Sequence, residues 1–337
     1  MSQTSTNGTG LQARSHGGLR RPDPFRDLGG VPVPGGILSV GQAGPPPREA
    51  EAVVLAVHGV TSSHLAWRTV ARELNREAAV ALLAPDLRGR GRSAAVGGPF
   101  GARTHIDDLL RVLDAAGVER AILAGHSMGA YLAARLAADH PDRAAAVVLV
   151  DGGPYIPVPP DEDPDALLAV VVEQLTSRLQ MTFDSADEYV ARWSAHPALR
   201  REWNDDLEAY ARFELDGPAG AMRCTVSEEA LVADCTDMMQ DESTLRALDR
   251  VTAPLYLARA ERGLLDDQPV LSDAVVEAFV AAHPDARVEY LLGTNHYTVV
   301  LGSGSGPRRV AALITAAIPH AVRAGALKLP NSSKFAT

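Results

Sequence analysis

The stretch Leu123-Ala124-Gly125-His126-Ser127-Met128-Gly129-Ala130 decides how the rest of the chain is interpreted. An apolar run over 121–124 stops at a glycine, and a helical pattern of small residues begins just after the serine. This order predicts a buried strand, a sharp turn and a helix. Glycines stand two residues before and two residues after Ser127, where side chains would collide with the neighbouring strand and helix. We therefore expect Ser127 to occupy a strained turn at the end of a strand.

The same residues match the pattern G-x-S-x-G, in which a nucleophilic serine is exposed at a strand-to-helix turn. The bare pattern is only moderately specific, because glycine is a common residue. The strand pattern before it and the helix pattern after it supply the confirming context. The competing interpretation is a glycine-rich turn with an idle serine, and the context favours the nucleophile.

Composition restricts the class of protein. A chain of 337 residues is long enough for one large α/β domain with an insertion or for two small domains, and its 46% hydrophobic content is ordinary for a globular protein. The net charge of −10 disfavours nucleic acid as a partner, since binding phosphates requires clustered Lys and Arg. Only two cysteines occur, Cys224 and Cys235, and we expect two reduced thiols rather than a bridge.

The sequence contains neither an apolar run long enough to span a membrane nor the pattern of a secretory signal. Its apolar runs are shorter than a bilayer-spanning helix requires, and the Ser/Thr/Gly-rich segment 1–18 contains no hydrophobic stretch of the kind a secretory signal needs. We expect a cytoplasmic protein with a disordered N-terminal tail and no membrane partner.

Apolar strand runs alternate with helical patterns over most of the chain, and the alternation is interrupted once. Between Tyr155 and Arg250 only amphipathic helical patterns occur. This organisation predicts an α/β core over 25–153 and 251–325 with a helical cap over 154–250, and tails at 1–24 and 326–337.

Several motifs occur in an order that resembles the α/β-hydrolase fold family over roughly Val31–Arg323. They are His58-Gly59, Pro85-Asp86-Leu87-Arg88-Gly89-x-Gly91-x-Ser93, Gly125-His126-Ser127-Met128-Gly129 and Asn295-His296. The resemblance implies a mostly parallel eight-stranded sheet with helices on both faces and a helical cap inserted after the sixth strand. It also implies a catalytic triad in the chain order serine, acid, histidine.

A serine hydroxyl is a weak nucleophile at neutral pH and requires a base within hydrogen-bonding reach. The chain has ten histidines. Only His296 follows the final strand, where the resemblance places the base. His126 lies inside the serine motif, and we expect its ring to point away from Ser127.

The acid of the triad departs from the pattern of the family. The family usually carries Gly-x-x-Asp in the loop after the seventh strand, but Gly263 stands at the acid position here. Asp151, at the end of the sixth strand, is the favoured replacement, although an Asp often caps such a strand end. Glu261, Asp266 and Asp267 remain as alternatives from the shifted loop.

The turn geometry further predicts an oxyanion hole from the backbone N–H groups of Val60 and Met128. Three arginines, Arg88, Arg90 and Arg92, lie in the loop that follows Pro85. We expect them to be solvated or paired rather than to bind phosphate.

The sequence thus favours a serine hydrolase that cleaves a carboxylic ester, lactone or thioester of a small molecule, with no cofactor and no metal. The alternatives are a carbon–carbon bond hydrolase or cofactor-free haloperoxidase of the same fold, or a non-catalytic ligand-binding protein. Dehalogenase and epoxide-hydrolase chemistry is disfavoured, because those members need an aspartate where this chain has Ser127. The acyl and alcohol specificity and the oligomeric state stay open.

Overall fold

A computed structural model describes residues 22–26 and 29–323. Eight strands form one sheet in the order β1-β2-β4-β3-β5-β6-β9-β10. Strands β1 and β2 are antiparallel to their neighbours, and the remaining neighbours pair in parallel. The strand bounds are β1 Gly29–Val33, β2 Gly36–Ala43, β3 Ala52–Val57, β4 Val80–Pro85, β5 Ala121–His126, β6 Ala144–Val150, β9 Leu255–Arg262 and β10 Arg287–Asn295. The expected eight-stranded, mostly parallel sheet is confirmed.

Helices cover both faces of this sheet, which explains why its central strands are apolar throughout. Alternate residues of β3 face opposite sides, with Val54 in the hydrophobic cluster on one face and Val53 in the cluster on the other. Helices α1 and α10 contribute to the first cluster, and α2, α3 and α9 contribute to the second. Their bounds are α1 Arg68–Glu77, α2 Ala102–Ala115, α3 Met128–Asp139, α9 Asp273–Ala282 and α10 Ser305–Arg323.

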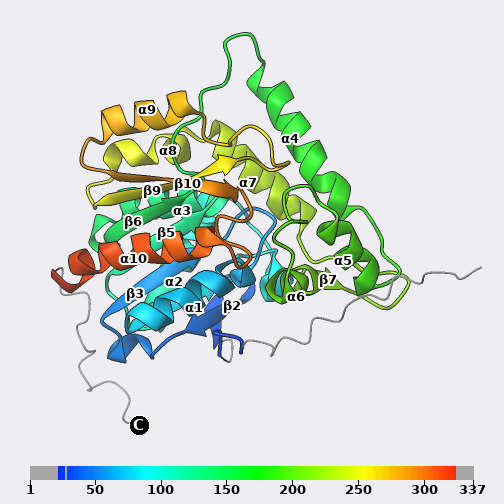
Figure 1. Ribbon diagram of the computed structural model, residues 1–337, viewed down its shortest axis with the longest axis horizontal. Coiled ribbons are helices and arrows are strands. Elements are labelled where there is room, and N and C mark those ends of the chain that lie inside the picture. Colours follow the sequence, from blue (N-terminus) through cyan, green and yellow to red (C-terminus); the bar gives the residue numbers. More distant parts are fainter. Residues whose placement is uncertain (1–21, 27–28, 324–337) are drawn as a thin grey trace, which may run out of the picture.

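Helices α4 to α8 lie between β6 and β9 in the sequence, and Figure 1 shows α4, α5 and α6 gathered beside the sheet. Each begins after a residue whose side chain accepts a hydrogen bond from the first turn, which is why the helices start where they do. We call residues 154–250 the inserted segment. Its helices are α4 Pro164–Leu179, α5 Ala186–Ser194, α6 Asp205–Phe213, α7 Glu228–Gln240 and α8 Glu242–Leu245.

A small hairpin within the inserted segment was not expected from the sequence. Strand β7, Leu215–Asp216, pairs with β8, Arg223–Cys224. Strands of two residues are too short to produce a readable alternation of polar and apolar positions. Both cysteines are free thiols.

The expected tails, 1–24 and 326–337, lie outside the described residues except for residues 22–24. Within the described part of the chain, every helix is too short or too polar to cross a bilayer. The division into core and cap stays a prediction.

Candidate active site

Ser127 lies at the turn between β5 and α3, with φ 54° and ψ −123°. Few non-glycine residues adopt this backbone conformation, and it costs of order 1–3 kcal/mol. The two flanking glycines make the turn possible. A Cβ atom on Gly125 would lie 2.0 Å from the carbonyl oxygen of Gly129, and one on Gly129 would lie 2.1 Å from that of Val57. The close approach predicted for these glycines is therefore present.

Asp151 reaches the same edge of the sheet because β5 and β6 are parallel neighbours. His126 is opposite Val150 in the register, so the next residues, Ser127 and Asp151, both follow the carboxyl ends of their strands. The Ser127 N–H donates to the carbonyl of Val150, and the Asp151 N–H donates to that of Ala258 on β9. The sheet hydrogen bonding thus continues up to both residues and holds them beside one another.

His296 follows β10 directly and its ring lies between the other two side chains. Its Nε2 lies 3.1 Å from Oγ of Ser127, and its Nδ1 lies 2.7 Å from Oδ2 of Asp151. The second oxygen of Asp151 accepts the N–H of Ala260 at 3.1 Å. Asp151 is fully buried and His296 is 6% exposed, whereas Ser127 is partly exposed. A hydrogen-bonded chain therefore runs from the buried carboxylate through the imidazole to an accessible hydroxyl.

The alternative carboxylates bind other groups. Glu261 accepts the N–H of Gly293 and pairs with Arg262. Asp266 accepts hydrogen bonds from Arg262 and from the side-chain amide of Asn295. Asp267 accepts the N–H of Leu265 at 3.4 Å. The contact with His296 that the structure shows comes from Asp151, and not from Glu261 near the end of β9 or from the two aspartates of the loop after it.

The two expected oxyanion donors belong to turns on either side of the serine. Met128 is the first residue of α3, and Val60 follows Gly59, whose Cβ position is 3.2 Å from Cβ of Ser127. Neither N–H donates a backbone hydrogen bond to a described residue. The assignment of both groups as oxyanion donors stays a prediction.

His58 fixes the peptide unit that carries the Val60 N–H. Its Nδ1 donates to the carbonyl oxygen of Gly59 at 2.8 Å, and its Nε2 accepts the N–H of Leu87 at 3.0 Å. The N–H of Ser62 also donates to the Gly59 carbonyl. Because carbonyl and N–H point in opposite directions across a trans peptide, holding one directs the other. Burial lowers the pKa of His58 to about 4, which keeps the ring neutral and able to serve as both donor and acceptor.

His126 contacts the backbone and the ring of His296, which was not expected from the sequence. Its Nε2 donates to the backbone carbonyl of His296 at 2.8 Å, and the two rings lie 4.8 Å apart between centroids. Burial and the nearby His296 ring lower its pKa. An x position in a motif carries no sequence signal for a contact 170 residues away.

Two of the three arginines after β4 are paired, and both of these are buried rather than solvated. Arg88 is buried and forms a bidentate ion pair with Asp108, and Arg90 is buried and pairs with Asp234. Arg92 is exposed and lies over the ring of Phe213. Buried charges need partners because desolvation is costly, and here the partners come from helices α2 and α7.

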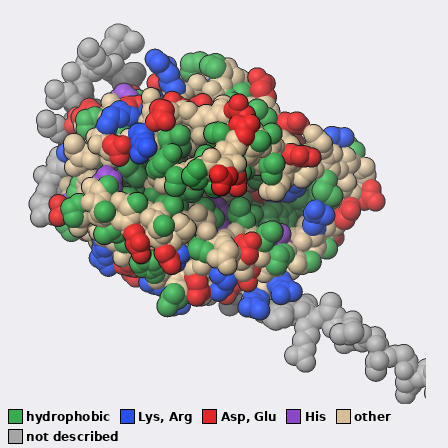
Figure 2. Space-filling view, turned by 90° about the horizontal axis from the view of Figure 1, so that it is seen from above, with side chains coloured by type: hydrophobic (Ala, Val, Ile, Leu, Met, Phe, Trp, Pro, Cys, Tyr) green, Lys and Arg blue, Asp and Glu red, His purple; other side chains and the backbone are tan. Residues whose placement is uncertain are grey.

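The inserted segment contacts the site from two directions. The hydroxyl of Tyr210 on α6 donates to Oγ of Ser62, close to the expected oxyanion donor. The ring of Trp193 on α5 packs edge-on against Tyr297, which in turn contacts the His296 ring. Figure 2 shows hydrophobic side chains gathered in a hollow across the middle of one face.

Comparisons with known proteins agree with this architecture. The family model of the α/β-hydrolase fold matches residues 52–207. Lipase LipV of Mycobacterium tuberculosis is 37% identical over 219 residues, which cover 64% of this chain and 77% of that protein. The chain belongs to the α/β-hydrolase fold family. It is a hydrolase of this fold.

Two further similarities extend over most of the chain. The 2-(acetamidomethylene)succinate hydrolase of Mesorhizobium japonicum is 28% identical over 246 residues, covering 73% of this chain and 81% of that protein. A crystal structure of E-2-(acetamidomethylene)succinate hydrolase superposes with a TM-score of 0.70 at 22% identity, covering 88% of this chain and 99% of that one. At that identity the structural likeness concerns the fold alone.

Proposed function

We propose that this protein is a serine hydrolase that cleaves carboxylic esters, lactones or thioesters through an acyl-enzyme intermediate. The observation that carries the proposal is the hydrogen-bonded chain Ser127–His296–Asp151, with contacts of 3.1 and 2.7 Å. These are the distances at which a base activates a hydroxyl and a carboxylate orients the base.

In the first step Ser127 Oγ attacks the carbonyl carbon while His296 Nε2 takes the hydroxyl proton. Asp151 accepts the hydrogen bond of Nδ1–H, which selects the tautomer with a free Nε2 and stabilises the imidazolium once it forms. The developing oxyanion binds to the N–H groups of Val60 and Met128. Collapse of the tetrahedral intermediate expels the alcohol or thiol, which takes the proton from His296. Water then cleaves the acyl-enzyme by the same route.

We further propose that residues 154–250 form a cap over this site, which would select the substrate. The contacts Tyr210–Ser62 and Trp193–Tyr297 support this assignment, because they join the inserted segment to residues beside the triad. The similarity to a lipase is consistent with an ester substrate. Because one relative is named a 2-(acetamidomethylene)succinate hydrolase, an acetamido-substituted dicarboxylate belongs in the substrate panel.

The test is a chain-length series of p-nitrophenyl esters run beside lactones, thioesters and that dicarboxylate. We expect turnover of at least one ester series and its loss in Ser127→Ala. An enzyme that hydrolyses only the dicarboxylate would contradict the ester assignment and leave the hydrolase class intact. Absence of turnover on every class would contradict the catalytic proposal.

A further inference from the structure

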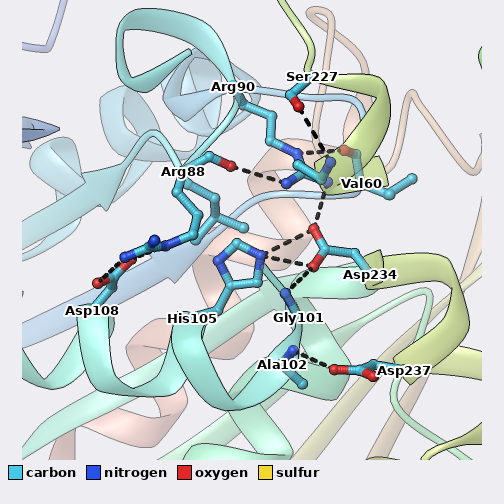
Figure 3. A network of polar contacts seen from close by, with 12 residues as sticks. Val60, Arg88, Arg90, Gly101, Ala102, His105, Asp108, Ser227, Asp234 and Asp237 are labelled. Atoms are coloured by element: carbon cyan, nitrogen blue, oxygen red, sulfur yellow. Dashed lines mark hydrogen bonds and ion pairs between the residues drawn. The ribbon is translucent and has the colours of Figure 1, made fainter. Parts of the chain in front are cut away.

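Arg90 is a buried arginine that touches the expected oxyanion loop without touching the triad. Its Nε donates to the carbonyl oxygen of Val60 at 3.0 Å, and its Nη1 donates to that of Arg88 at 3.0 Å. Its Nη2 lies 2.5 Å from Oδ2 of Asp234 (Figure 3). The side chain is 0% exposed, so its charge is balanced by the protein alone.

Asp234 belongs to α7 in the inserted segment, and it joins that helix to the core. It also accepts the N–H of Gly101 at the start of α2 and a hydrogen bond from His105 Nε2, both at 3.0 Å (Figure 3). Burial alone would raise the pKa of Asp234, but His105 and Arg90 hold it below its usual value. The carboxylate is therefore charged and provides the balancing charge for Arg90.

The loop that carries Arg90 is shaped to receive α7. The N–H of Ser227 donates to the carbonyl of Gly89, which has φ 75°. A Cβ atom on Gly89 would lie 2.8 Å from Cβ of Ala230 on α7, so only glycine permits this approach. Arg90 thus lies next to the point where α7 is docked on the loop after β4.

Val60 is held on both of its peptide units. The unit before it is fixed by His58 at the Gly59 carbonyl, and the unit after it is fixed by Arg90 at the Val60 carbonyl. The backbone torsions of Val60 join the two units, so fixing both carbonyls fixes the direction of the Val60 N–H. The Val60 side chain also packs against the hydrophobic cluster of α4 and α7 residues that includes Leu231 and Cys235.

A buried ion pair is a poor way to gain stability, because its desolvation cost commonly equals or exceeds its electrostatic gain. Its geometric effect is more specific. A guanidinium has donors in a fixed fork and can contact a carbonyl and a carboxylate at once, which an ammonium on a flexible stem cannot reproduce. Arg90 can therefore hold the Val60 carbonyl at a fixed position relative to Asp234 on α7.

We propose that Arg90 is a positioning residue that holds the Val60 oxyanion donor in place while Asp234 of α7 is docked against it. The inserted segment then acts on the oxyanion hole through this one ion pair. The inference rests on the proposed function, since it concerns the same site. It adds that substrate turnover depends on an ion pair between the cap and the core.

The test uses Arg90→Lys and Asp234→Asn, measured on the best ester well below the unfolding temperature of each variant. Losing an oxyanion donor costs about 10²–10³-fold in kcat, and we expect displacement of the donor to cost about tenfold or more, with KM changed less than threefold. The affinity for a trifluoromethyl ketone, which places an oxyanion in the same hole, should fall in parallel with kcat. In the double variant the two effects should not add.

Two matched controls distinguish displacement of the Val60 N–H from a general loss of folding stability. Arg88→Lys alters an equally buried ion pair in the same loop that has no side-chain contact with Val60. Asp237→Asn alters the neighbouring contact of α7 with the N–H of Ala102. Both should lower the unfolding temperature and leave kcat near wild type.

The proposal would be overturned if Arg90→Lys and Asp234→Asn lowered kcat no more than these controls, or if the ketone affinity stayed constant. Failure of the proposed function would look different: the wild-type protein itself would turn over no ester. Should Asp234→Asn fail to fold, Arg90→Lys with its Arg88→Lys control decides the question alone.

Discussion

Oδ2 of Asp151 lies 2.7 Å from Nδ1 of His296, although 145 residues separate them in the chain. Asp151 stands at the end of β6, one strand nearer to Ser127 than the loop after β9, where the family pattern leads one to expect the acid. The carboxylate is fully buried and its other oxygen accepts a backbone N–H, so it is held in one orientation. A carboxylate fixed in this way can select the imidazole tautomer without moving.

The Asp151–His296 contact predicts the effect of a nearly isosteric substitution. Asp151→Asn keeps the shape of the side chain, but its amide favours the wrong tautomer of His296, and we expect kcat to fall by about 10⁴-fold. Glu261→Gln is the matched control, because Glu261 contacts Gly293 and Arg262. Steady-state kinetics on the best ester measure both. A wild-type rate in the Asp151 variant, or an equal loss in both variants, would contradict the assignment of the acid.

Much of this fold could be predicted from the sequence. Continuous apolar runs such as Ala52–Val57 indicate strands buried on both faces, and the structure confirms them. Ser127 can be identified because required glycines flank it, and His296 because it follows the last strand. Contacts between residues far apart in the chain could not be predicted. Arg90 and Asp234 are 144 positions apart, and no local sequence pattern indicates that this arginine pairs with this aspartate. The sequence alone does not decide between Asp151 and the carboxylates near Gly263, since an aspartate at the end of a strand can equally well cap that strand.

The strained backbone of Ser127 predicts a trade-off between stability and function. Ser127→Gly removes the Cβ atom from a residue with φ 54°, whereas Ser127→Ala keeps it. Relief of strain is worth of order 1–3 kcal/mol, and the greater freedom of glycine in the unfolded chain offsets part of it. We expect both variants to be inactive and the glycine variant to be more stable than the alanine variant by about 1 kcal/mol in urea unfolding. A less stable glycine variant would show that the turn is not strained.

The close packing of the serine turn predicts a strong effect at Gly129. A Cβ atom there would lie 2.1 Å from the carbonyl oxygen of Val57, a backbone atom that cannot turn aside. We expect Gly129→Ala to lower the free energy of unfolding by about 3 kcal/mol or more. Gly97→Ala is the control, because nothing lies within 4 Å of its Cβ position. Equal unfolding midpoints for the two variants in urea would contradict the described geometry.

The lowered pKa of His58 predicts that stability falls as the pH falls. Its folded pKa of about 4 lies below the ordinary value of 6.5, so between these values the unfolded chain binds more protons than the folded one. The stabilising effect of the neutral ring is fully present above pH 6.5 and is lost as the pH falls towards 4. At about 1.4 kcal/mol per pKa unit this amounts to about 3 kcal/mol. Urea unfolding at a series of pH values measures it.

His58→Gln supplies the control for this pH dependence. The glutamine amide donates through its NH₂ group and accepts through its carbonyl oxygen, so it can replace the contacts with Gly59 and Leu87 but does not titrate. We expect the variant to lose a clear part of the stability change between pH 7.5 and pH 5, with the remainder coming from groups such as His126, whose pKa is also lowered. A pH dependence identical to that of the wild-type protein would rule out His58 as a source.

The central claim is that Ser127 is a nucleophile activated by His296, and covalent labelling tests it most directly. A fluorophosphonate probe reacts with an activated serine, and mass spectrometry of the digested protein locates the adduct. We predict one adduct per chain, on Ser127, that is absent in Ser127→Ala and slowed by orders of magnitude in His296→Ala. A folded wild-type protein that remains unlabelled at Ser127, or labels equally well without His296, would contradict the account.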